Sequence, residues 1–374
     1  MAESVLGPLE IELLPARQGD AVLLTWGPLG DRRRLLVDGG PARAYAAVSA
    51  RLRAVAEQGA LELLVLSHID RDHIDGALLL TNDADLRIGI NEYWFNGPAQ
   101  VSPKLGAAEG EVLAALIGAR GIPLNAAFGQ GTVCAPPDGP RPARTLPGGL
   151  VLTVLGPGPD DLANLRLNWR PVMRDEGLMF TDEKEALAAL RSSRSLNPAK
   201  AYLSGARRRP DVAELLATRS ARDTSASNRS SIVLLAEYAG HRVLLPADAT
   251  PAALTVAVRR LLAERAADRL ELTALMLPHH GSDHNITREL LELMPAEYYL
   301  FSSDGRKYPH PSDACVARCL AYGRPASTLV FNYRGPRTLP WLNEALLRPR
   351  HNGVRYPVNG DGVTLSLPAR HGSR

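Results

Sequence analysis

The segment LVLSHIDRDHIDGALLL, residues 64–80, constrains the fold and chemistry of this chain more than any other. It begins with an apolar run that is typical of a buried strand, and its last residues suit a helix. Between them His68, Asp70, Asp72 and His73 lie within six residues. Adjacent carboxylates repel one another unless a cation or a proton lies between them, and imidazole and carboxylate groups are ligands of zinc and manganese. The segment therefore predicts a metal site at a sheet edge, with a polar surface turn as the alternative.

Short apolar runs bounded by Gly and Asp predict strands in both halves of the chain. The expected strands lie at residues 9–26 (two strands about a Gly-Asp turn), 33–40, 62–67, 87–97, 149–156, 228–249 (a hairpin about Gly240), 272–278, 297–303 and 328–332. Helices are expected at 41–59, from 76 onward, and at 111–121, 251–266, 287–294 and 313–323. This order predicts an α/β (α+β) fold with two sheets packed face to face and helices outside.

One large domain is predicted for residues 1–345. Residues 157–227 are polar and charged, and they indicate an inserted helical or partly mobile segment. Residues 346–374 contain Arg and His and are predicted as a loop-like C-terminal tail.

The composition indicates a soluble protein, because 45% of the residues are hydrophobic and 22% are charged. The sequence has no run of 18 apolar residues and no secretory signal pattern, so we expect a cytoplasmic protein without a membrane partner. The three cysteines, Cys134, Cys315 and Cys319, fit a reducing compartment. A net charge of +3 permits a nucleic-acid substrate but does not require one.

The HIDRDH motif resembles the HxHxDH motif of the metallo-β-lactamase superfamily, with Asp70 in place of the middle His. This HxDxDH form is similar to the ComEC-like subgroup, named for competence proteins that process DNA during uptake. Further segments match that subgroup in order: QGDAVLL, LLVDGG, SNRSSIVLLAEYAGHRVLLPADA, LMLPHHGSDHN and SSDGRKYPHP. The resemblance covers about residues 9–335 and implies an αββα four-layer sandwich.

The resemblance also implies a ligand set for one or two Zn²⁺ or Mn²⁺ ions. His68 and Asp70 fall where the family holds its first metal, and Asp72 and His73 fall where it holds the second. Asp248 matches the Asp that bridges both metals, although Ala247 replaces the usual Gly.

One residue of the pair His279 and His280 matches the last metal ligand. His280 is favoured because the ligand His of the wider superfamily is often followed by Gly. That superfamily also supplies a further His before the bridging Asp, whereas this chain has no His from 74 to 240. The first site is therefore expected to be depleted, so that one metal or two unequal metals bind.

The implied activity is that of a phosphodiesterase or nuclease that acts on DNA or nucleotides through metal-activated water, with Asp72 orienting the water. His284 and His310 are the candidate acids for the leaving group. Candidate substrate-binding or supporting residues are Ser282, Asn285, Lys307 and Asn228. Stand-alone ComEC-like proteins resemble components of bacterial phage-defence systems, which adds a protein partner to the expectation.

Two other functions fit the sequence. One is a hydrolase of lactam, lactone or thioester bonds, which would have an apolar pocket without phosphate-contacting arginines. The other is a non-catalytic sandwich that binds a partner, which the change at Ala247 and the missing His favour. Metal content separates the non-catalytic sandwich from the two enzymes, and activity on phosphodiesters against esters separates the enzymes from each other.

Overall fold

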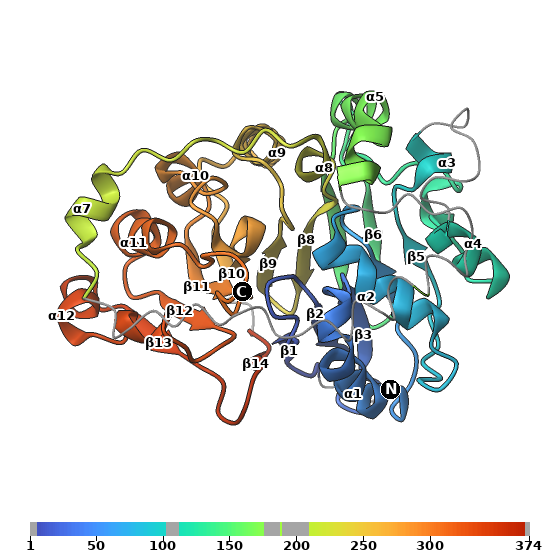
Figure 1. The fold of residues 1–374 in the computed structure, drawn as a ribbon, viewed down its shortest axis with the longest axis horizontal. Helices are drawn as coiled ribbons and strands as arrows, with labels where there is room; N and C mark the ends of the chain where they lie inside the picture. The colour runs from blue at the N-terminus through green and yellow to red at the C-terminus, as the bar shows by residue number, and fades with distance from the viewer. Residues whose placement is uncertain (1–5, 102–111, 176–187, 189–208, 371–374) are drawn as a thin grey trace.

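Two mixed β-sheets form the framework of the protein (Figure 1). The computed structural model describes residues 6–101, 112–175, 188 and 209–370. Within these residues, the first sheet has the strand order β14 (Val363–Leu367), β1 (Leu9–Leu13), β2 (Val22–Trp26), β3 (Arg33–Val37), β4 (Leu63–Val65) and β5 (Tyr93–Trp94). The second has the order β13 (Gly353–Arg355), β12 (Thr328–Phe331), β11 (Ala296–Phe301), β10 (Leu272–Met276), β9 (His241–Leu245), β8 (Val233–Tyr238), β7 (Val151–Gly156) and β6 (Ala143–Thr145).

Each sheet combines an antiparallel part with a parallel part. Strands β14, β1, β2 and β3 pair antiparallel, whereas β3, β4 and β5 pair parallel. In the second sheet β6 to β9 are antiparallel, and β9 to β13 are parallel. Because parallel strands end at the same edge of a sheet, the loops that follow them gather there.

Helices connect the strands. The α-helices are α1 (Tyr45–Ala56), α2 (Arg71–Asn82), α3 (Pro98–Val101), α4 (Val112–Ala119), α5 (Pro159–Asp175), α7 (Val212–Ala217), α8 (Ala226–Arg229), α9 (Pro251–Glu264), α10 (Arg288–Leu293), α11 (Asp313–Tyr322) and α12 (Glu344–Leu347). Short 3-10 helices are η1 (Ala42–Ala44), η2 (Ala126–Phe128), η3 (Pro278–Gly281), η4 (Leu339–Trp341) and η5 (Arg348–Arg350).

Three apolar clusters define the layers. The middle cluster lies between the sheets and joins residues such as Leu24 of the first sheet to Leu234 of the second. The other two clusters lie on the outer faces of the sheets, where α1 and α2 cover the first sheet and α9, α10 and α11 cover the second. Strand residues therefore alternate between the middle cluster and a helix-covered face. This arrangement is consistent with the predicted sandwich.

The structure corrects several predicted elements. Residues 346–374 are not loop-like throughout, because β13 joins the second sheet and β14 joins the first. The helix after the HIDRDH motif begins at Arg71 rather than at 76, so that the last residues of the motif form its first turn. The strand expected at 87–97 is confined to Tyr93–Trp94. Helices α5 and α7 lie in the predicted insertion and α8 begins there, whereas residues 176–187 and 189–208 are outside the described residues.

None of the helices in the described ranges has both the length and the apolar character that crossing a membrane requires.

Candidate metal centre

Turns at the ends of parallel strands carry the predicted ligands. Asp70 is the N-cap residue of α2 after β4, and Asp72 and His73 lie in the first turn of that helix. Asp248 follows β9, and His279 and His280 follow β10 in η3. Strands β4, β9 and β10 come from both sheets, so the centre forms where the two sheets meet at one edge.

A contact between two glycines fixes the position of α2 against the loop after β3. A Cβ atom on Gly76 would lie 1.8 Å from the carbonyl oxygen of Gly39, and one on Gly39 would lie 2.2 Å from the amide nitrogen of Ala77. The amide of Gly39 donates to the carbonyl of His73, at 3.1 Å. Since any side chain would force the two segments apart, the glycines let Asp38 reach His73 directly.

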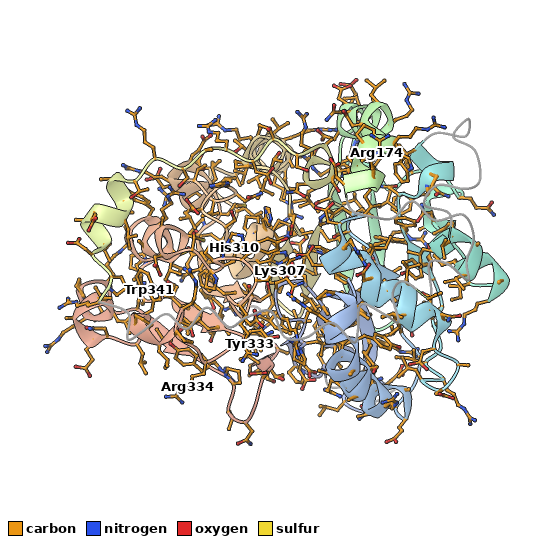
Figure 2. The ribbon with its side chains drawn as sticks, viewed as in Figure 1. Arg174, Lys307, His310, Tyr333, Arg334 and Trp341 are labelled. Carbon is orange, nitrogen blue, oxygen red and sulfur yellow. The ribbon has the colours of Figure 1, made fainter. Side chains whose placement is uncertain are left out.

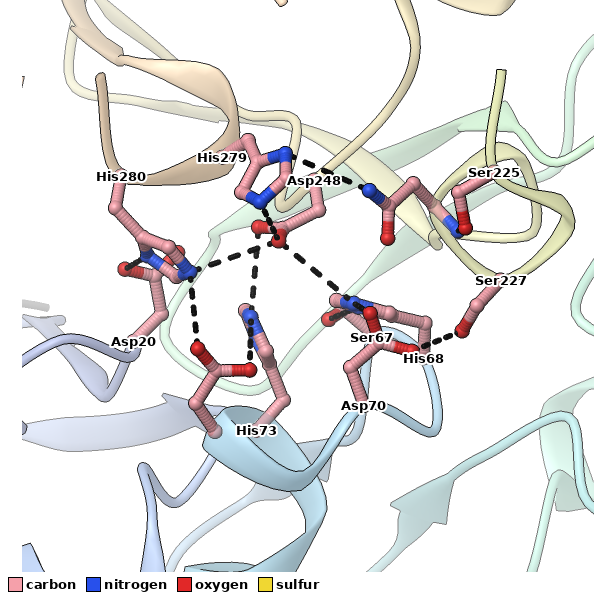
Figure 3. Close-up of polar contacts among 12 residues, drawn as sticks. Asp20, Ser67, His68, Asp70, His73, Ser225, Ser227, Asp248, His279 and His280 are labelled. Carbon is pink, nitrogen blue, oxygen red and sulfur yellow. Dashed lines mark hydrogen bonds and ion pairs between the residues drawn. The ribbon is translucent and has the colours of Figure 1, made fainter. Parts of the chain in front are cut away.

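Four imidazoles converge on the carboxylate of Asp248 (Figure 3). The distances from their Nε2 atoms to an oxygen of Asp248 are 3.4 Å for His73, 3.5 Å for His280, 3.6 Å for His279 and 3.9 Å for His68.

Asp70 and Asp72 stand on the periphery of this group. Nε2 of His68 lies 3.5 Å from Asp70, and Nε2 of His280 lies 3.7 Å from Asp72. The structure thus brings together all seven residues that the sequence proposed as ligands.

A hydrogen-bond partner orients each ring through its other nitrogen. Nδ1 of His73 lies 2.9 Å from Asp38, and Nδ1 of His280 lies 2.9 Å from Asp20. A carboxylate only accepts hydrogen bonds, so both Nδ1 atoms carry hydrogen and both Nε2 atoms point toward Asp248. Such outer partners set the orientation and the tautomer of metal-binding histidines.

Three further partners complete this outer layer. The Ser67 hydroxyl donates to Asp38 and lies 3.0 Å from Nδ1 of His68. Nδ1 of His279 lies 3.1 Å from Oδ1 of Asn285. The hydroxyl of Ser227 donates to Asp70.

Several buried atoms of the centre have no hydrogen-bond partner among the described residues. They are Nε2 of His68, Nε2 of His73, Nε2 of His280 and Oδ1 of Asp248. An unpaired buried polar atom is costly, and native proteins rarely keep four of them in one place without a ligand. Asp20, His73, Asp248 and His280 each offer a ligand atom, and these atoms lie within 4.8 Å of one another. The donor set therefore fits a metal cation.

The charge balance of the centre points the same way. Burial lowers the pKa of His73, but Asp248 and Asp38 outweigh burial and raise it well above 6.5. Burial raises the pKa of Asp248, but His280, His279 and His73 outweigh burial and hold it well below 3.8. These shifts favour a protonated His73 beside an ionised Asp248 when no metal is bound, and a metal would displace that proton.

Because protons and a metal compete for the same ring nitrogens, the stability of the metal-free protein and that of the metal-loaded protein should depend differently on pH. Although burial lowers the pKa of His279, Asp248 and Asp223 raise it to about 9 from 6.5. In the metal-free protein the resulting stability is complete below pH 6.5 and is lost as the pH rises through about 9. Thermal unfolding of chelator-treated protein should therefore show a falling Tm over this range.

The metal-loaded protein should not lose stability over the same range, because fewer protons compete with the metal. The variant His279→Gln should flatten the trend of the metal-free protein. A Tm that stays constant or rises in chelator-treated wild type would contradict the proposed charge balance.

An unusual backbone conformation turns both adjacent imidazoles into the centre. His279 and His280 have φ values of 51° and 56°, in the left-handed region that non-glycine residues seldom adopt. Such strain is concentrated at functional sites. The predicted choice between His279 and His280 is therefore unnecessary, because both rings face Asp248.

Ala247 also lies in the left-handed region, with φ of 48°, and it replaces the Gly that the resemblance predicts. The left-handed conformation destabilises an L-residue by about 1–2 kcal/mol, and glycine avoids this strain. Glycine instead loses about 0.5–1 kcal/mol more chain entropy than alanine when the protein folds. The variant Ala247→Gly should thus range from neutral to about 1 kcal/mol more stable in urea unfolding. A loss of more than about 1 kcal/mol would show that the methyl group of Ala247 is needed for packing.

The predicted acids differ in their positions. The His310 ring lies 5.6 Å from that of His279, between centroids. His284 is exposed, and it contacts the centre through its backbone, which accepts from the amide of Asp223 and donates to Ser282. Burial, together with the nearby His280 and His279, lowers the pKa of His310 to about 3. The Nδ1 atom of His310 is buried and has no hydrogen-bond partner among the described residues, and its role as the proton donor stays a prediction.

Three of the predicted substrate-binding residues lie behind the imidazoles. Asn285 is fully buried and donates to Asp223 and to the carbonyl of Asp248, at 2.8 and 3.2 Å. Asn228 is buried and donates to Asp223 at 2.7 Å. Ser282 is buried and accepts from the amide of His284. These contacts indicate that the three residues position the centre.

Lys307 differs from the other three, because it is exposed and lies over the ring of Tyr308, close to His310 in Figure 2.

The sequence did not assign Asp20, Asp38, Ser67, Ser227 and Asp223 to the centre. Asp20 and Asp38 belong to the QGDAVLL and LLVDGG segments, which were the available signal. Asp20 and Asp38 orient His280 and His73 only because the fold places their segments beside those that carry these rings.

Comparison of the sequence with models of known protein families finds no match, and comparison with curated proteins finds no significantly similar sequence. The two mixed sheets and the buried His/Asp cluster are consistent with a metallo-β-lactamase-like fold.

Proposed function

We propose that this protein is a metal-dependent hydrolase of the metallo-β-lactamase type and that its substrates are phosphodiesters in DNA or nucleotides. The observation that carries the proposal is the set of four buried atoms without a hydrogen-bond partner among the described residues, namely Nε2 of His68, His73 and His280 and Oδ1 of Asp248. The HxDxDH motif supports the ComEC-like form. A protein partner in phage defence remains a prediction of that resemblance.

Two groups of ligands around Asp248 support two metal positions. Asp72, His73 and His280 form one group, because Nε2 of each imidazole lies within 3.9 Å of Asp72. His68 and Asp70 form the other, and His279 is the remaining imidazole that faces Asp248. In this assignment His279 replaces the histidine that the sequence lacks between 74 and 240.

A bound zinc or manganese ion would supply a water of lowered pKa and positive charge beside the scissile group. The side chain of Asp72 is 18% exposed, the most open position after Asp70 and His279. Its carboxylate could orient the attacking water and accept its proton. Asp38 and Asp20 hold the two rings beside Asp72 in place, so the reacting groups need little reorganisation.

The environment of Arg43 supports the proposal that the substrate is an anion. Its guanidinium donates to Oε1 of Gln18, and within the described residues no carboxylate lies within ion-pair distance of it. A Cβ atom on the next residue, Gly19, would lie 2.0 Å from the carbonyl of Asp72, so this loop packs directly on the centre. A half-buried cation that is held only by a neutral amide is available to a phosphate. The lactam, lactone and thioester alternative gives it no role.

Replacing Arg43 by alanine should therefore raise the KM for a phosphodiester by roughly 10- to 100-fold, the value of a charged hydrogen bond. The values of kcat and of the metal content should change by a much smaller factor than the KM. Arg51→Ala is the matched control, since Arg51 lies on α1 and pairs with Glu12. Steady-state kinetics with bis(p-nitrophenyl) phosphate measures both variants, and equal KM values would remove Arg43 from the substrate site.

The function is tested first by metal content. Protein purified without chelator should contain about one or two equivalents of zinc or manganese by mass spectrometry. The double variant Asp72→Ala, His73→Ala should contain much less. The loaded wild type should then cleave phosphodiesters in preference to lactam or thioester substrates. A folded wild type that takes up no metal on reconstitution would instead favour the non-catalytic, partner-binding sandwich.

A further inference from the structure

A cavity of about 330 Å³ lies beside the metal centre, between the first turns of α5 and α9. Ala249, which follows Asp248 directly, forms part of its wall, as do other small apolar residues. Three arginines also line it: Arg141, Arg229 and Arg260. Its volume is at the lower end of the range for small-molecule sites.

Two buried polar atoms in the cavity wall have no hydrogen-bond partner among the described residues. They are Oγ of Ser231, a residue that is 1% exposed, and Nε of Arg141, a residue that is 7% exposed. The remaining nitrogens of Arg141 contact Glu264 and the carbonyl of Ala257. Both unpaired groups can donate to an acceptor inside the cavity.

The first turn of α9 adds one backbone donor, because Pro251 has no amide hydrogen and the amide of Ala253 donates to Thr250. The helix has 14 residues, its first turn contains no acidic residue, and Ala252 of that turn lines the cavity. The amide of Ala252 has no acceptor inside its own helix, and the helix dipole favours an anion there. The N-terminus of α5 is different, because Asp160 and Asp161 already compensate it.

We propose that this cavity binds a small phosphate monoester. A tetrahedral dianion offers several acceptor oxygens, which suit the hydroxyl of Ser231, the guanidinium of Arg141 and the amide of Ala252. The apolar wall would receive the organic part of the ester. Arg141 and Arg260 pair with Glu264, and Arg229 pairs with Asp161, so the bound anion would compete with these carboxylates for the guanidinium groups.

Helix α8 connects this cavity to the metal centre. Arg229 lines the cavity and donates to Asp161, at 2.7 and 3.0 Å. Two residues earlier on the same helix, Ser227 donates to Asp70. A phosphate that draws Arg229 away from Asp161 would move a four-residue helix and the partner of a proposed ligand. Occupation of the cavity should therefore change metal affinity, and this second effect rests on the proposed metal centre.

The test measures binding of adenosine monophosphate and of inorganic phosphate to the chelator-treated full chain by calorimetry. The variant Ala252→Phe fills the cavity from an exposed position, and Ala263→Phe on the same helix is its control. Arg229→Met removes one cation, and its control Arg259→Met removes an exposed arginine of α9 that pairs with Glu289. We expect Ala252→Phe and Arg229→Met to weaken binding at least about 10-fold, whereas both controls bind like wild type.

Absence of binding to wild type would overturn the proposal, and so would binding that Ala252→Phe leaves unchanged. Coupling is read separately as the zinc affinity with and without saturating adenosine monophosphate, where at least about a 5-fold change is expected. An unchanged zinc affinity would refute the coupling but not the cavity site. A protein that binds the monoester but takes up no metal would instead refute the proposed function.

Discussion

Replacing Asp248 by asparagine is expected to abolish metal binding and to reduce hydrolysis by more than the roughly 100-fold that loss of an outer partner can cause. Its carboxylate lies within 3.9 Å of all four imidazoles. Asparagine keeps the size of the side chain but removes the negative charge that balances a dication. Metal content by mass spectrometry and kcat/KM for a phosphodiester measure the two effects.

Asp268→Asn is the matched control for this change, because Asp268 is exposed and distant in sequence from every proposed ligand. It should keep full metal content and activity. Unfolding curves should confirm that both variants are folded. An Asp248→Asn protein that retains metal at the wild-type ratio would mean that Asp248 does not bridge the metal positions.

The second large effect is expected at Asp38, which does not face the metal itself. Its carboxylate accepts from the Ser67 amide and hydroxyl, both at 2.8 Å, and from Nδ1 of His73. In Asp38→Asn an amide group would have to replace one of these acceptors, which disturbs the tautomer or the orientation of His73. Metal affinity should fall about 10- to 100-fold in a chelator competition assay.

Asparagine is the suitable replacement because Asp38 has φ of 61°, a conformation that Asn tolerates well. The exposed Asp31 provides the control Asp31→Asn. If zinc affinity in Asp38→Asn equals that of wild type, the contact between Asp38 and His73 is structural only.

Local sequence patterns predicted the metal centre only where its residues are contiguous. The His68–His73 segment carries four of the proposed ligands within six residues, so the order of residues alone indicates their proximity. The left-handed backbone at His279 and His280 has no such signal, because neither residue type requires it. The sequence therefore presented two adjacent histidines as alternatives, whereas the fold makes both available.

The fold followed a similar rule. Continuously apolar strands such as β8 and β10 were predictable from their runs of apolar residues, and the helices between them were predictable from the spacing of theirs. The strand β14 has the sequence VTLSL, with a clear alternation of buried and exposed residues. Its position after a polar, glycine-containing segment favoured a loop, and pairing with β1 decides the matter. A local sequence pattern cannot predict such pairing, because the two strands are separated by most of the chain.

The pairing of β13 and β14 with different sheets has a consequence for truncation. β13 is an edge strand of the second sheet, and β14 is an edge strand of the first, next to β1. A chain shortened before Gly353 would uncover the hydrogen-bonding groups of β1 and β12 together. Unprotected edges template intermolecular pairing. Strands β13 and β14 thus tie the two sheets together at their edges, and their removal would favour aggregation.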